Sequence, residues 1–491
     1  MEKGNIRTSL RWKTIILLSG FLLALAACQK LASIINEEEG TQPPSGSTVD
    51  SPSFSLNGGT YAQSQTVTLQ CSTPGASFRY TTDGSDPKTS PTSAVGDSVF
   101  VSMPMTIKAY AFSGSIDSAV STSSAFTITS GIVFVSTAGN DTHQGTVKFP
   151  KKTIASGIAL ADSLFTTGEV RVAQGVYDLS SQLDLKEGIS LYGSYVNDFS
   201  ARSLSNAVTT LQDIRASGDC TAVASSNIGN ATVFDGFMVK GANTSSGSSY
   251  CISISNSSLS LRNNTIVCGT ATSYSVGIVM STSSSIISNN VIYGGNAGQR
   301  NIKISMANGS NPKIYNNTLI ADTGGYRYVI QLQADGASCH PTLKNNLFVD
   351  LTSDSVSSAL YGVCHMDSGT GHSPYAYTTN LFYLSPVATG EGAYVYYSSG
   401  NTNNINNDNF FSKPAYIYPS GSYPLTYTDP AWRNLVNQDP LFISPSSGDF
   451  HLQVSSPARN TGTDLSSEIP LYDRDGNPRT APWSIGAYEV D

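Results

Sequence analysis

The chain has 491 residues, with 27 Lys and Arg against 35 Asp and Glu, and its formal net charge at pH 7 is −8. An acidic chain with only 13% charged residues lacks the basic field that attracts nucleic acid, so we expect no nucleic-acid partner. Abundant Ser, Thr, Asn and Gly argue against helical bundles and coiled coils, and 25 Tyr with 18 Phe argue against a disordered chain.

Residues 1–27 have the pattern of an export signal. Basic residues precede an apolar run, Ile15 to Leu25, that is short for a membrane span. The next residues, Leu25-Ala26-Ala27-Cys28, resemble the bacterial lipobox, and this resemblance implies cleavage before Cys28 and acylation of that residue. We therefore expect a lipoprotein held on a membrane through lipid (palmitate or similar chains) on Cys28. The alternative is an ordinary signal peptide with an incidental Cys.

Residues 28–50 fit a flexible tether, because three consecutive Glu are followed by a stretch rich in Gly, Pro and Ser. Gln29, and not an acid, follows the lipobox Cys. By analogy with lipoprotein sorting, we expect the bacterial cell envelope, and there the outer membrane, as the location.

Residues 51–130 read as short strands of period two between turn signals, which predicts an immunoglobulin-like β-sandwich. The stretch from Pro74 to Pro87, with its Tyr-Thr-Thr-Asp-Gly-Ser-Asp-Pro run, resembles the chitobiase/β-hexosaminidase C-terminal domain family. Asp83 and Asp86 are either turn formers, which we favour, or calcium ligands.

From residue 131 the chain repeats. Asparagine doublets precede apolar strands, and an Asp-Gly step at Gly236 falls in the same phase; the second residues of these steps are spaced by 26 to 34 residues and are Gly236, Asn264, Asn290, Asn317, Asn346 and Asn380. Strand patterns fill the intervals and helical periodicity is missing there, so the repeat predicts a parallel β-helix of about three short strands per coil. Asn tolerates the left-handed bend between strands, and identical amides stacked about 4.8 Å apart can form a structural ladder.

The beginning and end of residues 131–491 support this architecture. Val135 to Asp141 and Pro150 to Ile154 resemble the opening of right-handed β-helix domains of the pectate-lyase-like superfamily, which implies a right-handed coil. Ile154, Ile158 and Ala161 share one helical face behind a Thr153 N-cap, so we expect a short helix that caps the core. Residues 435–491 resemble the choice-of-anchor ending of many surface proteins, and we expect them to form a C-terminal cap.

Enzymatic chemistry on such a fold needs clustered carboxylates. Between Phe234 and Leu351 the acids are Asp235, Asp322, Asp335 and Asp350. Asp322 and Asp335, beside Arg300, Lys303 or Arg327, are weak candidates for a lyase-like site, although solvated surface charge explains them equally well. We expect no catalytic residues, no metal and no cofactor; calcium enters only if the protein is a polysaccharide lyase.

Six cysteines remain beside Cys28, and an exported chain can form disulfides. The spacing from the repeat favours pairing of Cys220 with Cys251, and of Cys339 with Cys364. Cys339-His340 and Cys364-His365 could also form a Cys₂His₂ zinc site, but neighbours on a strand point to opposite faces, so we favour the disulfide. Unpaired, these cysteines would be small buried hydrophobes.

Three functions fit the chain. We favour a surface-displayed, non-catalytic lipoprotein, monomeric, that binds glycan or another surface ligand through its β-helix. Tyr-rich stretches such as Tyr375 to Tyr377 and Tyr394 to Tyr397 could stack on sugars, although packing residues are the commoner reading. The alternatives are a polysaccharide lyase or glycoside hydrolase acting on an acidic polysaccharide, and a structural envelope protein.

Overall fold

The computed structural model describes residues 48–490, apart from residues 322–323, 334–336, 338, 352–359, 366–375, 384–392, 399–426, 429–432 and 437. Among the described residues, 48–59 and 65–127 form one compact unit, and 60–64 and 128–490 form a second. Cys28, Asp322, Asp335 and Tyr375 lie outside the described residues.

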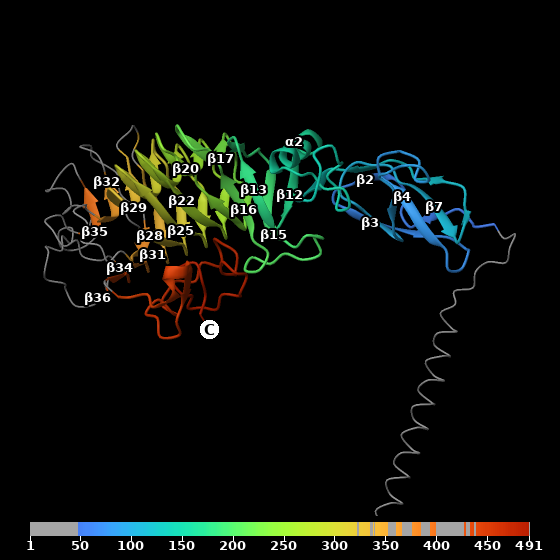
Figure 1. The fold of residues 1–491 in the computed structure, drawn as a ribbon. Coiled ribbons are helices and arrows are strands. Elements are labelled where there is room, and N and C mark those ends of the chain that lie inside the picture. The colour runs from blue at the N-terminus through green and yellow to red at the C-terminus, as the bar shows by residue number, and fades with distance from the viewer. Residues whose placement is uncertain are drawn as a thin grey trace, which may run out of the picture. The chain divides into compact units, whose positions relative to one another are not determined.

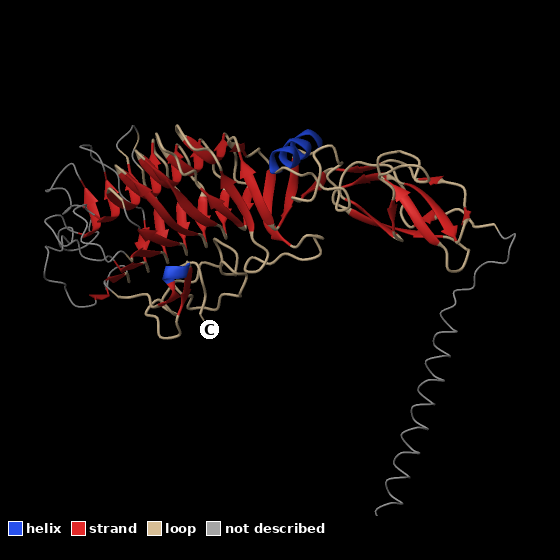
Figure 2. Ribbon diagram, viewed as in Figure 1, coloured by secondary structure: helices blue, strands red, loops and turns tan. Residues whose placement is uncertain are grey.

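The first unit contains two small antiparallel sheets, as an immunoglobulin-like sandwich requires (Figure 2). Alternation builds its core: in β3 the inward Val67 and Leu69 are buried while their neighbours are not. One sheet has the order β1 (Ser53–Phe54), β3 (Gln65–Gln70), β6 (Ser98–Val101). The other has the order β5 (Ala94–Val95), β4 (Ser77–Thr81), β7 (Lys108–Ser113), β8 (Ile116–Asp117), with β9 (Ser121–Thr122) also on β7; β2 (Gly59–Tyr61) pairs with β10 (Phe126–Ile128).

The second unit is a right-handed parallel β-helix whose coils each place one strand in each of three parallel sheets (Figure 1). The first sheet contains β11 (Ser130–Val135), β12 (Thr167–Ala173), β15 (Ile189–Tyr195), β18 (Val233–Asp235), β21 (Ser260–Arg262), β24 (Ile286–Ser288), β27 (Lys313–Tyr315), β30 (Thr342–Lys344) and β33 (Ala376–Thr378).

The second sheet contains β13 (Gly175–Leu179), β16 (Thr209–Asp213), β19 (Phe237–Lys240), β22 (Thr265–Ala271), β25 (Val291–Ala297), β28 (Thr318–Ala321), β31 (Leu347–Asp350), β34 (Leu381–Tyr383) and β37 (Leu435–Val436), with β36 (Tyr427–Thr428) antiparallel at its edge. The third sheet contains β14 (Leu183–Asp184), β17 (Cys220–Ser226), β20 (Ser249–Ser255), β23 (Tyr274–Ser281), β26 (Arg300–Ala307), β29 (Tyr326–Leu332), β32 (Leu360–His365) and β35 (Ala393–Ser398). We call the bend between the first and second sheets the first corner. The bend between the second and third sheets is the second corner, and the bend between the third and first sheets is the third corner.

The asparagine doublets form the first corner, and the two members of each doublet have different roles. The first member makes the bend, because Asn263, Asn289, Asn316 and Asn345 all have φ between 53° and 57°. The second member makes the ladder: each Nδ2 donates to the Oδ1 of the next coil, at 3.0 Å from Asn264 through to Asn380 and at 3.2 Å from Asn380 to Asn434. Asn434 continues the ladder beyond the residues expected from the repeat.

The third corner has a smaller ladder of serines. The hydroxyl oxygens of Ser257, Ser283 and Ser310 each accept a hydrogen bond from a backbone N–H of the preceding coil, at 3.1 to 3.2 Å. These hydroxyls satisfy buried donors that the bend would otherwise leave without a partner. Two of the three corners therefore contain a polar residue repeated in register.

A helix covers the N-terminal end of the coils (Figure 1). α2 (Ile154–Leu164) begins after Thr153, whose hydroxyl oxygen accepts a hydrogen bond from the Ser156 N–H, and it buries Ile154, Ile158 and Ala161. Gly157 faces the valines of β11 and β12, where a Cβ would approach Val135. The predicted capping helix is thus confirmed, with its N-cap and its buried face.

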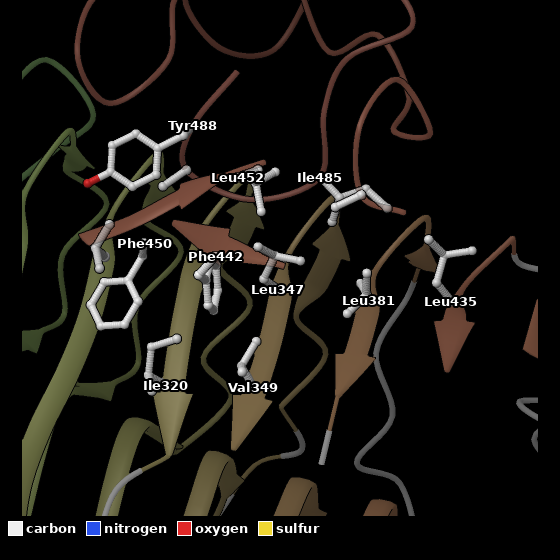
Figure 3. Close-up of a cluster of buried hydrophobic side chains, with 13 residues drawn as sticks. Ile320, Leu347, Val349, Leu381, Leu435, Phe442, Phe450, Leu452, Ile485 and Tyr488 are labelled. Atoms are coloured by element: carbon white, nitrogen blue, oxygen red, sulfur yellow. The ribbon is translucent and has the colours of Figure 1, made fainter. Parts of the chain in front are cut away.

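The C-terminal residues return along the coils and cover the second sheet. β38 (Phe442–Ser444), the short 3-10 helix η1 (Pro445–Ser447) and β39 (Asp449–Leu452) place Phe442, Phe450 and Leu452 against Leu347 and its neighbours (Figure 3). Farther along the chain, Glu468 accepts hydrogen bonds from Lys313, Tyr315 and Lys344 on the first sheet. Burial opposes ionisation, but these hydrogen bonds lower the pKa of Glu468 to about 2.

Candidate functional site

The two aspartates that the structure describes between Phe234 and Leu351, Asp235 and Asp350, are held in ion pairs. Asp235 is buried, and its carboxylate accepts hydrogen bonds from Arg202, Arg262 and Asn263 at 2.7 to 3.0 Å. Burial opposes ionisation of Asp235, but the two guanidinium groups lower its pKa. A carboxylate fixed in this way is an anchor for neighbouring coils, and it has no free face for a substrate.

The basic residues considered for a lyase-like site separate in the structure. Arg327 is buried and pairs with Asp350 at 3.3 Å, and Lys303 is also buried, with Nζ donating to Gly294 O at 2.5 Å and to Asn301 Oδ1 at 2.9 Å. Both therefore lie inside the second corner. Arg300 alone of the three is partly exposed.

Arg300 lies on a different face of the third sheet, among tyrosines. The strand register aligns Tyr274 with Arg300 and Tyr326 on successive coils. In the next row, Val276 and Ile302 align with Tyr328, and these three residues form a buried cluster. The cluster is separate from the core inside the coils, because Ile278 and Ile304 of that core are not part of it. Tyr250 and Tyr274 pack against the cluster, so the tyrosines and Arg300 lie together over an apolar base. We call Tyr250, Tyr274, Arg300 and Tyr326 the tyrosine–arginine surface.

The guanidinium of Arg300 lies near two tyrosine rings. Its Cζ lies 5.7 Å from the Tyr274 ring centroid and 6.0 Å from that of Tyr328, within the range of cation–π contacts. Within the described part of the chain, no oxygen accepts a hydrogen bond from this guanidinium. Tyr326 in the same row is 45% exposed. The surface thus offers aromatic faces and a planar fork of N–H donors to a ligand.

The sequence did not reveal this surface, because its residues do not recur in the asparagine phase. The Tyr-rich stretches chosen instead, Tyr375 to Tyr377 and Tyr394 to Tyr397, contain side chains outside the described residues. A usable signal was present: Tyr250, Tyr274 and Tyr326 each stand at or near the start of a third-sheet strand.

The preferred disulfide between Cys220 and Cys251 is wrong. Their strands β17 and β20 are neighbours, but the register aligns Cys220 with Ser249, two residues before Cys251. Cys220 Sγ is directed instead to Ser217 O and Gly218 O of its own turn. The second pair stays a prediction, because the Cys364 side chain lies outside the described residues.

Metal sites receive no support from the described residues, among which no group of three His, Cys, Asp or Glu side chains could hold an ion. Asp83 accepts hydrogen bonds from the Ser85 N–H at 3.0 Å and from the Thr92 hydroxyl at 2.6 Å, and Asp86 accepts one from the Lys88 N–H at 2.9 Å. These contacts are those of turn-forming side chains.

A hollow of about 400 Å³ lies beside the start of α2, bordered by Thr137, Lys152, Asp178 and Gln182 among others. Tyr177 also borders it, but its hydroxyl already donates to Ala173 O at 3.0 Å. The N–H groups before α2 are occupied too, because Asp141 Oδ1 accepts from Lys152 N and Thr153 N. The Tyr177 hydroxyl and these two N–H groups are therefore already engaged within the protein.

Comparison with known proteins gives two family matches. Residues 56–122 match the chitobiase/beta-hexosaminidase C-terminal domain, and residues 137–366 match a protein family of unknown function, DUF1565. No curated protein matches. Among the described residues, no helix has the length and apolar character needed to cross a membrane.

Solved structures similar to the chain have low identity. A pectin methylesterase in complex with a hexasaccharide shares 11% identity, with 55% of this chain and 90% of that chain covered at a TM-score of 0.27. A family 28 exopolygalacturonase of Yersinia enterocolitica shares 9% identity, with 72% and 96% covered at 0.14. The catalytic domain of a GH87 α-1,3-glucanase shares 12% identity, with 72% and 75% covered at 0.17.

The strand order and the family matches agree on the architecture. The antiparallel strands from β3 to β9 lie within the residues matched by the first family, and the stacked coils span those matched by the second. The second unit is therefore a right-handed parallel β-helix, and the chain is similar to the chitobiase/beta-hexosaminidase C-terminal domain family over residues 56–122 and to the DUF1565 family over residues 137–366.

Proposed function

We propose that this protein is a non-catalytic glycan-binding protein of the bacterial cell envelope, and that it binds through the tyrosine–arginine surface. The observation that carries the proposal is the setting of Arg300, whose guanidinium lies 5.7 and 6.0 Å from two tyrosine ring centroids and donates a hydrogen bond to no oxygen among the described residues. Such a group is oriented in advance for a ligand and loses little freedom on binding.

The chemistry of the surface favours an acidic sugar chain. Tyrosine rings offer flat apolar faces to pyranose rings, and the guanidinium fork matches a carboxylate in two parallel hydrogen bonds. The described residues of these two rows, from Tyr250 to Tyr328, include no acid that would repel a uronate. Successive coils repeat these positions along one direction, which suits an extended polymer.

The two described aspartates between Phe234 and Leu351 form no carboxylate pair that faces a substrate, which supports binding over cleavage. Hydrolysis of a glycosidic bond generally needs two carboxylates facing the substrate. Asp235 and Asp350 are both committed to arginines. The name of the preceding domain, which refers to chitobiase and β-hexosaminidase, agrees with a protein that acts among glycans.

The location forms part of the same proposal. A lipid on Cys28 would anchor the chain, and the tether over residues 28–50 would let it extend from the membrane. Metabolic labelling with a fatty-acid analogue tests this: the parent should incorporate label and Cys28→Ser should not. Equal labelling of both would contradict the anchor.

Binding is tested on polysaccharide arrays that contain acidic and neutral chains. We expect the parent to retain an acidic polysaccharide, with Tyr326→Ala weakening binding about tenfold and Arg300→Ala weakening it by at least as much for acidic chains alone. Tyr472→Ala is the matched control, because Tyr472 is 50% exposed but lies in the C-terminal segment. Unchanged binding in both surface variants would disprove the proposal that this surface binds the glycan. Release of shortened polysaccharide products would show that the protein is an enzyme.

A further inference from the structure

Two cysteines that the spacing of the repeat did not pair lie together at the second corner. Cys251 is on β20 of one coil, and Cys268 is on β22 of the next. Both are thiols in the structure; the Cys251 thiol lies 3.5 Å from Val267 O, immediately before Cys268, and the Cys268 thiol is close enough to act on the pKa of the Cys251 thiol. Both are buried, with exposed fractions of 0% and 6%.

Glycines make room for the two sulfurs. A Cβ placed at Gly241 would lie 2.9 Å from Cys251 Sγ, and one at Gly277 would lie 3.4 Å from Cys268 Sγ. A Cβ at Gly295 would approach Cys268 Cβ to 2.8 Å. Residues without a side chain thus lie on several sides of this pair, and a larger residue at Gly241 or Gly295 would displace the cysteines.

The other described cysteines have different surroundings. Cys71 is in the first unit, where its thiol is directed to Thr73 O, and Cys220 is directed to carbonyls of its own turn. Cys220 is also out of register with Cys251, and Cys339 lies between β29 and β30, at the third corner. Cys268 is therefore the described cysteine whose position suits a bond to Cys251.

We propose that Cys251 and Cys268 are joined by a disulfide bond that forms while the chain folds in an oxidising compartment. The two thiols lose two protons and two electrons, and a disulfide of the compartment, on a small molecule or a protein, accepts the electrons and is reduced to two thiols. One cysteine thiolate attacks that disulfide to give a mixed disulfide, and the other cysteine then displaces the carrier thiol.

The burial of the pair decides when this exchange happens. The hydrogen bond with Cys268, together with burial, raises the pKa of the Cys251 thiol well above its ordinary value, so the thiolate that exchange requires is rare in the folded coil. Oxidation therefore precedes closure of the corner. Once formed, the bond is shielded from reductants, and it ties two adjacent coils through a short loop.

The test uses the full chain, produced with its export signal in a bacterium that makes envelope disulfides. The protein is denatured in a thiol-alkylating reagent without reductant, digested and examined by mass spectrometry. We expect a linked pair of peptides containing Cys251 and Cys268, with Cys220 alkylated. Alkylation of both Cys251 and Cys268, or linkage of Cys251 to Cys220, would overturn the proposal.

Stability provides a second measurement. We expect the thermal midpoint of the parent to fall by several degrees when it is reduced in denaturant and refolded under reducing conditions, whereas Cys251→Ser and Cys268→Ser should lose this dependence on reductant. Cys220→Ser, the matched control, should keep both the linkage and the dependence. A parent midpoint that is indifferent to reduction would contradict the bond, and neither measurement depends on glycan binding.

Discussion

The first and second corners of the β-helix solve the same problem in different ways. Both must bend the chain between two parallel sheets and find partners for buried backbone groups. The first corner uses one residue type in register, so each amide of its ladder joins the coils before and after it. The second corner uses unlike polar residues on successive coils: Ser275, then Asn301 with Lys303, then Arg327.

The two corners therefore differ in how strongly each coil depends on its neighbours. At the first corner each buried amide finds its hydrogen-bond partner in the identical amide of the next coil, so every coil depends on its neighbours there. At the second corner each polar residue finds hydrogen-bond partners of its own, without an identical residue on the next coil. Particular coils can therefore hold a thiol pair, a buried lysine or an ion pair there. We therefore expect changes at the first corner to spread along the stack, and changes at the second corner to stay local and to be open to compensation.

The largest effect is expected at the middle of the ladder. Asn317 Nδ2 donates to Ile287 O, Tyr315 O and Asn346 Oδ1, and its Oδ1 accepts from the Asn290 N–H. Asn317→Leu would keep the volume but leave these buried groups without partners, and we expect the free energy of unfolding to fall by about 4 kcal/mol. Urea denaturation of the full chain measures this loss.

Asn206→Ala is the control for that measurement, because Asn206 is exposed and bonds only to neighbouring serines. We expect it to change the free energy of unfolding by less than about 0.5 kcal/mol. A comparably small loss for Asn317→Leu would show that the ladder is incidental to stability, and the contrast between the corners would fail.

A smaller effect, and a recoverable one, is expected at the second corner. Arg327→Met would leave the buried carboxylate of Asp350 without its guanidinium partner, and we expect a loss of about 3 kcal/mol. Adding Asp350→Leu should restore most of the loss, because replacing a buried pair by apolar residues is often neutral. Denaturation of both single variants and the double variant gives the coupling energy; a double variant no better than the singles would mean that this corner is as interdependent as the first.

The sequence was sufficient to predict the corners that repeat. Asn264 to Asn380 recur at nearly constant spacing, and a left-handed bend followed by an amide ladder is a physical reason for that spacing. The capping helix was predictable for a similar reason, because Thr153 and the period of Ile154, Ile158 and Ala161 are local signals. Asn434 was missed since the interval before it is nearly twice the usual one.

The candidate site and the thiol pair could not be predicted in the same way. Arg300 meets Tyr274 and Tyr328 only through the lateral register of three coils, and counting along one chain does not give that register. The error over Cys220 has the same cause: counting back from the first corner placed it opposite Cys251, whereas the strands align it with Ser249. Non-repeating contacts between coils require the structure.

The smallest effect concerns the segment that covers the second sheet. His451 lies between Asp449 and Asp475, with its ring nitrogens 2.5 and 2.8 Å from their carboxylates, and its ring lies 4.0 Å from that of Tyr488. The hydrogen bond with Asp475 acts most strongly; burial opposes it, Asp449 adds to it, and together they raise the pKa of His451 to about 9. The charged imidazole is therefore favoured by folding.

Because the folded pKa exceeds the ordinary 6.5, the stabilisation should be complete below about pH 6.5 and should disappear as the pH rises through 9. The side chain is 39% exposed, so solvent screening reduces the contribution to about 1 kcal/mol. The difference in unfolding free energy between the parent and His451→Gln, measured from pH 6 to 10, should shrink to near zero at the alkaline end. A difference that stays constant would mean that His451 acts by packing on Tyr488 and not by charge, and the C-terminal cover would then be held, like the second corner, by contacts that each act alone.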